Sequence, residues 1–379
     1  MGNKILFVTT HFPPDLHYGG VVESGYNTFT ALKKICNIRL VCVSKNPRYV
    51  KTNIKDDGEV FKSVLFHKYG FSFGIILFLI REILKIDFVY CHGIVTFPVV
   101  IAQIISMIFK KPYAVSTLGL TERSFSKRRL LKSIYFALFV FPLLKRAKFV
   151  RITSEIEGNF LKRYGINNII KIEHGLLLNK FSNLPDKYSI QSKIKTITSD
   201  MFIFLYLGRI SEEKGIDILI ESYNNFCKET EKDNHRLYIV GPDLNNYLKK
   251  FNIENNEKIV YIPGLYGADK IAMLRRADVV ILPSYTENFG NTVAESLVCE
   301  TPVITTTETP WRDILEYGCG LYIRPNISEL SDAMKKIYDI PDEDRKFMGK
   351  KGRELILSRY DIDKKAESLY MEFSHYLVK

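Results

Sequence analysis

The stretch Phe202-Ile-Phe-Leu-Tyr-Leu-Gly208-Arg209-Ile-Ser-Glu-Glu-Lys214-Gly215 decides the fold of the second half of this chain. Its unbroken apolar run predicts a strand that is covered on both faces, as in parallel sheets. A helix is predicted from about Ile216, so the loop between them ends the strand, where open α/β sheets bind ligands. Arg209 and Lys214 in that loop suit a diphosphate, although an ordinary solvated loop explains them equally well.

Similar apolar runs alternate with longer helical patterns along all 379 residues. This alternation predicts two α/β domains, each a Rossmann-like doubly wound parallel sheet. The predicted strands are Ile5–Thr9, Arg39–Val43, Phe88–Cys91, Tyr113–Ser116, Phe149–Thr153, Phe202–Leu207, Arg236–Val240, Val260–Ile262, Val279–Leu282, Val303–Thr306 and Leu321–Ile323.

The domain boundary is predicted in Ser182–Asp200, a polar segment without clear periodicity. We therefore expect an N-terminal domain over residues 1–185 and a C-terminal domain over 186–361. The remaining residues, 362–379, carry apolar side chains three or four positions apart, which predicts a closing amphipathic helix. Those apolar positions are Ile362, Ala366, Leu369 and Phe373.

A second motif follows the predicted strand Val279–Leu282 and reads Tyr285-Thr-Glu-Asn-Phe-Gly-Asn-Thr-Val-Ala-Glu295. Gly290 permits close approach of a ligand to the backbone, and a helix predicted from Asn291 offers free N–H groups to phosphate or sugar oxygens. Glu287 precedes that helix and should face the ligand, whereas Glu295 lies one turn further along, within reach of a ribose. Two surface glutamates at this spacing are also common by chance.

Together, Gly208-Arg209, Lys214-Gly215, Glu287-Asn-Phe-Gly290, Glu295 and Thr301-Pro-Val-Ile resemble the family 4 glycosyltransferases of GT-B fold. The resemblance spans nearly the whole chain and is most specific over residues 202–306. It implies two domains facing a central cleft and a retaining transfer that needs no metal ion or other cofactor.

The resemblance also assigns roles to individual residues. Arg209 and Lys214 would bind the donor diphosphate, and Glu295 the nucleotide ribose. Glu287 and the Asn288–Gly290 backbone would meet the donor sugar, next to the helix start formed by Asn291 and Thr292.

The N-terminal half carries fainter matches. Gly19-Gly20, in a loop before a predicted helix over Val22–Ile35, resembles the family's glycine pair facing the donor phosphate, but a plain tight turn fits equally well. His92 ends a predicted strand and matches a family histidine, with a packed strand-end histidine as the alternative. Leu118 stands where the family often has histidine, so no side-chain role carries over there.

Three other segments depart from the family or carry no role. The loop Thr305–Trp311 lacks the family's glycines, and its tryptophan is interpreted as structural. Glu173-His174 replaces a family Pro-Asn and is assigned no function. No Asp-x-Asp motif and no His/Cys cluster stands in a suitable position beside the predicted diphosphate site, so metal-dependent chemistry is not expected.

Charge is distributed unevenly along the chain. Residues 1–200 hold 30 Lys and Arg against 13 Asp and Glu, an excess of 17, whereas residues 201–379 hold 24 against 29, a deficit of 5. An anionic partner is therefore expected for the first half. The segment Lys127–Lys148, with the apolar run Ile134–Leu144, suits an anionic membrane surface, and a buried helix with solvated ends fits as well. No nucleic-acid motif accompanies it.

Six scattered cysteines and the lack of a signal region predict a cytoplasmic protein that lies against the inner face of the cell membrane. The preferred function is a hexosyltransferase that moves sugar from a nucleotide-sugar donor to a glycan or lipid-linked acceptor in surface polysaccharide synthesis. A sugar-nucleotide epimerase of the same architecture and a non-catalytic sugar-binding protein are the alternatives. A dinucleotide oxidoreductase is disfavoured because no G-x-G-x-x-G follows the first strand. The sequence does not identify the nucleotide base, the transferred sugar, the acceptor or the oligomeric state.

Overall fold

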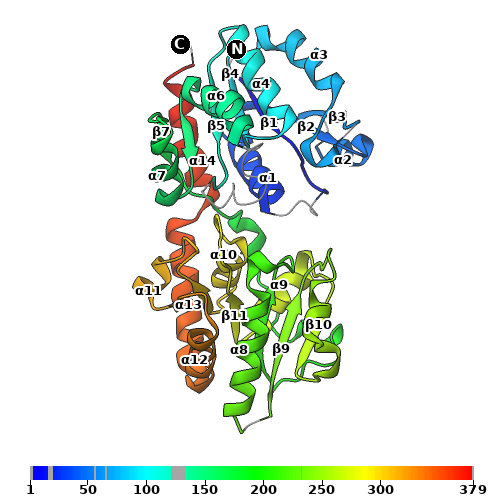
Figure 1. Cartoon of the computed structure of the whole chain (residues 1–379), viewed down its shortest axis with the longest axis vertical. Helices are drawn as coiled ribbons and strands as arrows, with labels where there is room; N and C mark the ends of the chain where they lie inside the picture. The colour runs from blue at the N-terminus through cyan, green and yellow to red at the C-terminus, as the bar shows by residue number, and fades with distance from the viewer. Residues whose placement is uncertain are drawn as a thin grey trace. The chain divides into compact units, whose positions relative to one another are not determined.

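The computed structural model of the chain describes residues 3–15, 20–54, 57–64, 66–120, 133–231 and 233–377 (Figure 1). The chain divides into two compact units. Unit 1 comprises Met1–Leu177 together with Ile362–Lys379, and unit 2 is Leu178–Asp361. Across these described ranges, no helix combines the length and the apolar character needed to cross a bilayer.

Unit 1 contains a seven-stranded parallel sheet in the order β3-β2-β1-β4-β5-β6-β7. Side chains alternate between its two faces, and both faces are buried, as expected for a parallel sheet. The strands are β1 (Lys4–Thr9), β2 (Asn37–Ser44), β3 (Gly58–Lys62), β4 (Phe88–His92), β5 (Tyr113–Ser116), β6 (Val150–Ile152) and β7 (Ile169–Lys171).

Helices cover both faces of this sheet. The unit 1 helices are α1 (Gly20–Lys33), α2 (Pro47–Ile54), α3 (Phe73–Glu82), α4 (Phe97–Ile108), the π-helical η6 (Phe136–Val140), α6 (Phe141–Arg146), α7 (Glu155–Arg163) and α14 (Ile362–Ser374). One core contains α3, α4, η6, α6 and α7 residues packed on Val8, Val89 and Val115 of the sheet. The other contains α1 and α14 residues packed on Phe7 and Phe88. Figure 1 shows α14, in red, next to α1, in blue.

Unit 2 contains a six-stranded parallel sheet in the order β10-β9-β8-β11-β12-β13. Its strands are β8 (Phe202–Leu207), β9 (His235–Val240), β10 (Ile259–Ile262), β11 (Val279–Leu282), β12 (Val303–Thr306) and β13 (Gly320–Ile323). Its helices are α8 (Ile216–Glu229), α9 (Gly267–Arg276), α10 (Asn291–Val298), α11 (Asp313–Tyr317), α12 (Ile327–Asp339) and α13 (Asp342–Arg359).

The prediction of two parallel-sheet α/β domains is confirmed. Each predicted strand is present, but β3 and β7 were not predicted. Both are edge strands with partly exposed side chains, so neither forms a fully apolar run. The polar segment predicted as a linker instead packs on unit 2: Ile190 and Ile197 are buried, and Arg276 donates to the carbonyl of Thr198 at 2.6 Å.

Two predictions fall outside the described residues. Gly19 of the glycine pair is one, and the cluster Lys127, Arg128, Arg129 and Lys132 is the other. The segment that follows the cluster is described. There Phe136, Val140 and Leu144 are buried in the core, whereas Leu138 and Phe139 are exposed.

Candidate active site

The charged residues predicted in the second half lie where the strand order of unit 2 reverses. β8 pairs with β9 on one side and with β11 on the other, so the loops after β8 and β11 leave the sheet next to each other. The backbone N–H of Tyr285 donates to the carbonyl of Glu213 at 3.1 Å and joins the two loops. Ligands of doubly wound sheets bind at such a switch point.

Lys214 and Glu287 form an ion pair across these two loops. Their side chains are 20% and 14% exposed, so the pair is partly buried yet accessible from solvent. Ser284 Oγ also lies 3.4 Å from the same Glu287 oxygen. Gly215 allows the two loops to approach because its φ is +68° and a Cβ there would lie 2.1 Å from the carbonyl oxygen of Pro283.

Arg209 stands at the start of the same loop and is half exposed. Its guanidinium lies 3.8 Å from the carboxylate of Glu213, four residues later in the chain. The hydroxyl of Tyr206, at the end of β8, donates to the Arg209 carbonyl at 2.7 Å. This bond fixes the Arg209 backbone at the edge of the sheet while its side chain can still turn toward an anion.

The start of α10 is built around Gly290, whose φ is +78°. A Cβ at Gly290 would lie 3.1 Å from Leu282 and 3.2 Å from Trp311, so a larger residue would crowd this turn. The buried Trp311 donates its indole N–H to the carbonyl of Phe289 and packs against that ring at 5.1 Å. The sole tryptophan thus holds the loop in front of the helix N-terminus, a position that favours negative charge.

The other predicted residues of this loop take different positions. Asn288 is exposed, whereas Asn291 and Thr292 are half-buried at the first two positions of α10. Thr292 Oγ1 donates to the carbonyl of Leu207 at 2.8 Å, so this hydroxyl ties the helix to the end of β8.

Glu295 is almost fully buried on α10. Lys270 of α9 donates to its Oε1 at 2.5 Å. This pairing supplies the opposite charge that a buried carboxylate requires. Sequence inspection missed Lys270, because it lies 25 residues earlier on another helix and no local motif marks it.

His92, at the end of β4 in unit 1, is 1% exposed. Its ring stacks on Phe7 of the neighbouring β1 with centroids 5.5 Å apart, and Gly25 of α1 packs against its edge. The structure therefore places His92 inside unit 1 and not on its surface. Gly20, the described member of the glycine pair, is the exposed first residue of α1.

Ser24 of α1 links His92 to His174. Its hydroxyl lies 3.2 Å from His92 Nε2 and 2.9 Å from His174 Nδ1. Burial, followed by the nearby Arg151 charge, lowers the pKa of His174 to about 3. The same causes, with His174 added, hold the pKa of His92 well below its usual value, so both rings are neutral near pH 7.

The loop after β5, where Leu118 replaces a family histidine, is organised by Glu157 of α7. The buried Glu157 carboxylate accepts hydrogen bonds from Thr117 Oγ1, Gly119 N and Leu120 N at 2.5 to 2.7 Å. Leu118 itself takes a left-handed backbone with φ of 58°. Sequence inspection missed Glu157 and Ser24, since both act on residues far away along the chain.

Among the described residues, no three His, Cys, Asp or Glu side chains gather as metal ligands would.

Two parallel-sheet α/β units give this chain the GT-B fold, and the charged loops of unit 2 lie at the switch point of its sheet. Solved structures agree on the fold. The chain superimposes on Alr3699/HepE from Anabaena, solved in complex with UDP and glucose, with a TM-score of 0.78 at 16% identity, covering 98% of this chain and 100% of that one. WaaG, a glycosyltransferase involved in lipopolysaccharide biosynthesis, gives a TM-score of 0.69 at 16% identity over 96% and 99%.

Sequence comparisons point to the same class. Residues 188–355 match the family model described as Glycosyl transferases group 1. The capsular polysaccharide biosynthesis glycosyltransferase CapM of Staphylococcus aureus is 27% identical over 213 residues, 53% of each chain. A D-inositol 3-phosphate glycosyltransferase of Pseudarthrobacter chlorophenolicus is 29% identical over 149 residues, 37% of this chain and 35% of that one. These alignments span about half or less of each relative.

Proposed function

We propose that this chain is a retaining glycosyltransferase that moves a hexose from a nucleotide-diphosphate donor to a lipid-linked glycan acceptor during surface polysaccharide synthesis. The observation that carries the proposal is the pairing of Lys214 with Glu287 beside the N-terminus of α10, at the switch point of unit 2. Cations and a helix N-terminus together suit a diphosphate. The name of CapM supports the class of product.

The proposed chemistry follows from these charges. As the bond between the sugar and the diphosphate breaks, negative charge grows on the leaving phosphate, and Arg209 and Lys214 stabilise it. The acceptor hydroxyl attacks from the same face, and its proton passes to the departing phosphate oxygen. The protein then supplies position and charge, with neither a protein nucleophile nor a metal ion.

The remaining residues would hold the two substrates. When the diphosphate takes Lys214, the Glu287 carboxylate becomes available to sugar hydroxyls, and the backbone of Asn288–Gly290 lines the same position. Glu295 would accept a ribose hydroxyl. Gly19 and Gly20 are proposed to face the donor phosphate and the acceptor from unit 1, whereas the buried His92 is not proposed to contact either substrate. We place the reaction in the cytoplasm, at the inner face of the cell membrane.

The test is a screen of UDP- and GDP-sugars for thermal stabilisation, beginning with UDP-glucose, followed by turnover of the best ligand. A ligand at 100 times its Kd stabilises the folded state by about 2.7 kcal/mol. Nucleotide release that requires an added lipid-linked glycan is the expected result. Interconversion of the sugar without acceptor would indicate an epimerase, and binding without turnover would indicate a sugar-binding protein. Either result would contradict the proposal.

A further inference from the structure

Helix α3 of unit 1 is apolar on both of its faces. One face, including Ile75 and Leu79, is buried in the core of the unit. The opposite face continues into the single 3-10 turn η4 (Ile83–Lys85) and leaves four large apolar side chains between 45% and 71% exposed. These are Phe73, Leu77, Ile80 and Leu84. Their spacing of four, three and four residues places them along one side of the helix. Contiguous apolar surface of this kind marks a contact surface.

The C-terminal end of α4 extends this surface. Met107 and Ile108 are exposed there. Lys111, just beyond them, donates from Nζ to the carbonyl of Leu84 at 3.2 Å, so the end of α4 lies against the end of η4. The six exposed residues, called the apolar edge below, are Phe73, Leu77, Ile80, Leu84, Met107 and Ile108.

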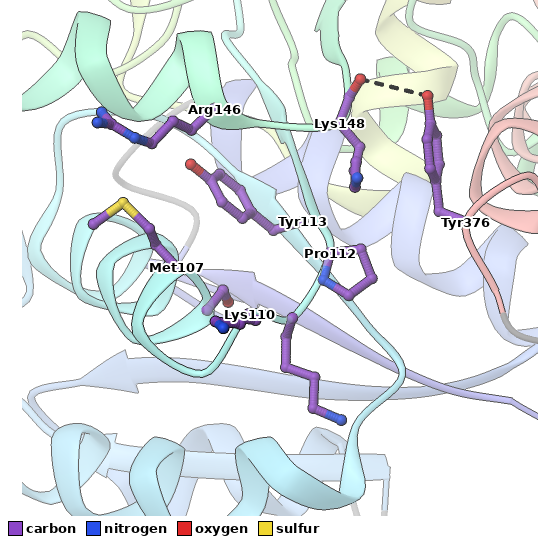
Figure 2. A pocket seen from close by; sticks show the side chains of 9 residues that line it. Met107, Lys110, Pro112, Tyr113, Arg146, Lys148 and Tyr376 are labelled. Carbon is purple, nitrogen blue, oxygen red and sulfur yellow. Dashed lines mark hydrogen bonds between the residues drawn. The ribbon is translucent and has the colours of Figure 1, made fainter.

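A basic pocket adjoins the apolar edge (Figure 2). It is a hollow of about 470 Å³ between the ends of α4 and α6 and Tyr376. Nine described residues line it, four of them cations and none acidic; the cations are Lys110, Lys111, Arg146 and Lys148. Within the described part of the chain, none of the four forms an ion pair. Met107 belongs to both the pocket and the apolar edge, so the two are continuous.

The helix C-termini of α4 and α6 account for part of this positive charge, since cations are favoured there. They do not account for its concentration. Over the described residues 73–120 and 133–148 the chain carries 7 Lys and Arg and only 2 Asp and Glu. One of those acids, Glu82, is already paired with Lys85 at 3.0 Å. A partner that covers this region must therefore be apolar in one part and anionic in another.

We propose that the apolar edge inserts into the interfacial region of an anionic phospholipid bilayer and that the basic pocket binds a lipid phosphate headgroup. Apolar side chains flanked by Lys and Arg are the signature of a surface that lies in the membrane interface. The proposal deepens the membrane association proposed above by naming its surface. It moves the main contact from the Lys127–Lys148 segment to α3, η4 and α4, with Arg146 and Lys148 contributing.

Insertion is tested by a fluorescence measurement on the full chain. The Leu77→Trp variant places an indole on the apolar edge, and Trp311, which is fully buried, supplies a constant background. Brominated phosphatidylglycerol vesicles should quench the new tryptophan. Phe347→Trp is the matched control, because Phe347 on α13 of unit 2 is also an exposed apolar residue, at 58% against 71% for Leu77. Its fluorescence should not change.

Vesicle co-sedimentation distinguishes the contribution of the basic pocket to membrane binding from that of the apolar edge. Lys110→Gln, Arg146→Gln and Lys148→Gln combined should weaken binding about 100-fold at low salt, because each cation near an anionic surface contributes roughly fivefold. This loss should shrink at high salt. Combined Phe73→Gln, Leu77→Gln and Ile80→Gln should weaken binding at both salt concentrations.

Matched controls lie in unit 2. Lys228→Gln, Lys249→Gln and Lys250→Gln remove three exposed charges, and Leu315→Gln, Phe347→Gln and Leu357→Gln remove three exposed apolar side chains. Neither control should alter vesicle binding.

Three outcomes would overturn the proposal. Leu77→Trp could stay unquenched, both test triples could bind vesicles as tightly as the wild type, or the apolar triple could convert a wild-type dimer into a monomer. The last result would show that a second copy of the chain covers the apolar edge. Vesicle binding needs no donor, so nucleotide-induced stabilisation of the same variants reports separately on the proposed transferase activity.

Discussion

The two units place different chemistry at the same topological position. In unit 2, the loops after β8 and β11 bring together charged side chains that solvent can reach, among them Lys214 and Glu287. In unit 1, the ends of β1 and β4 surround a buried, neutral group in which Ser24 joins His92 to His174. A shared strand order therefore fixes where a site can form, whereas local burial decides whether it can bind an anion.

Solvation explains the difference. Lys214 and Glu287 are 20% and 14% exposed, and their mutual attraction offsets part of the cost of removing each charge from water. His92 and His174 lie deep in unit 1 beside Arg151, and both burial and that positive charge oppose protonation. Unit 2 thus offers accessible charge to a ligand. In unit 1 the two histidines are neutral, and the buried Arg151 beside them is occupied by hydrogen bonds within the unit.

The largest effect is expected from removing the cations of unit 2. Lys214→Ala or Arg209→Ala should lower turnover by roughly 10²-fold or more, the scale for losing a preorganised charge at a developing anion. Arg209→Ala should change the melting temperature little because Arg209 is half exposed, whereas Lys214→Ala should lower it because the partly buried Glu287 carboxylate loses its partner. Steady-state kinetics with saturating acceptor measure the effect, with Lys250→Ala as an exposed control. Near-normal turnover in both variants would show that the cations of unit 2 do not stabilise the leaving diphosphate.

A smaller effect is expected at the buried carboxylate of unit 2. Glu295→Gln should weaken nucleotide binding about tenfold, because it replaces a charged acceptor with a neutral one. Titration calorimetry with the best nucleotide from the screen provides the measurement. Glu354→Gln, an exposed change on α13, is the control. Unchanged affinity in Glu295→Gln would show that Glu295 does not bind the nucleotide and serves only as the structural partner of Lys270.

Acid should destabilise unit 1 through its buried histidines. His174 has a pKa of about 3 in the folded chain, against the ordinary 6.5 when unfolded. The contribution of the neutral His174 ring to the free energy of unfolding is therefore fully present above pH 6.5 and is lost as the pH falls toward 3. Over that range the free energy of unfolding falls by about 1.4 kcal/mol per pH unit.

Urea unfolding at pH 7 and pH 5 tests this expectation. His174→Gln should lose about 2 kcal/mol less than the wild type on acidification, and His375→Gln, at an exposed position, should behave like the wild type. Equal acid losses in all three proteins would show that the His174 ring is not held neutral.

No effect is expected from a metal chelator. If Arg209, Lys214 and the start of α10 neutralise the diphosphate, transfer should continue in excess EDTA. Activity that EDTA abolishes and Mg²⁺ or Mn²⁺ restores would contradict this, and would give unit 2 a further cation that its own residues do not supply.

The sequence was most informative where residues close together in the chain act together. The strand and loop around Gly208 and Lys214, and those around Glu287 and Gly290, were predicted because each forms a continuous motif. The edge strands β3 and β7 were missed because exposure on one side breaks their apolar runs. The amphipathic helix predicted within residues 362–379 is present as α14, and its four predicted apolar positions are buried.

Contacts between distant segments could not be predicted. Lys270 reaches Glu295 from another helix, and Ser24 meets His174 across 150 residues. The burial of His92 also depends on Phe7 and Gly25, which come from other elements. A motif shows which side chains end a strand, but only the packed fold shows whether solvent can reach them.

The return of α14 to unit 1 has a consequence for the order in which the chain can fold during synthesis. Leu369 and Phe373 belong to the same core as Phe88 and Phe149, so unit 1 lacks part of its interior until residue 373 has left the ribosome. Unit 2 is one uninterrupted segment, Leu178–Asp361. Proteolysis of stalled nascent chains should find unit 2 protected before unit 1. Unit 2 therefore begins later in the sequence than unit 1 but completes its fold earlier during synthesis.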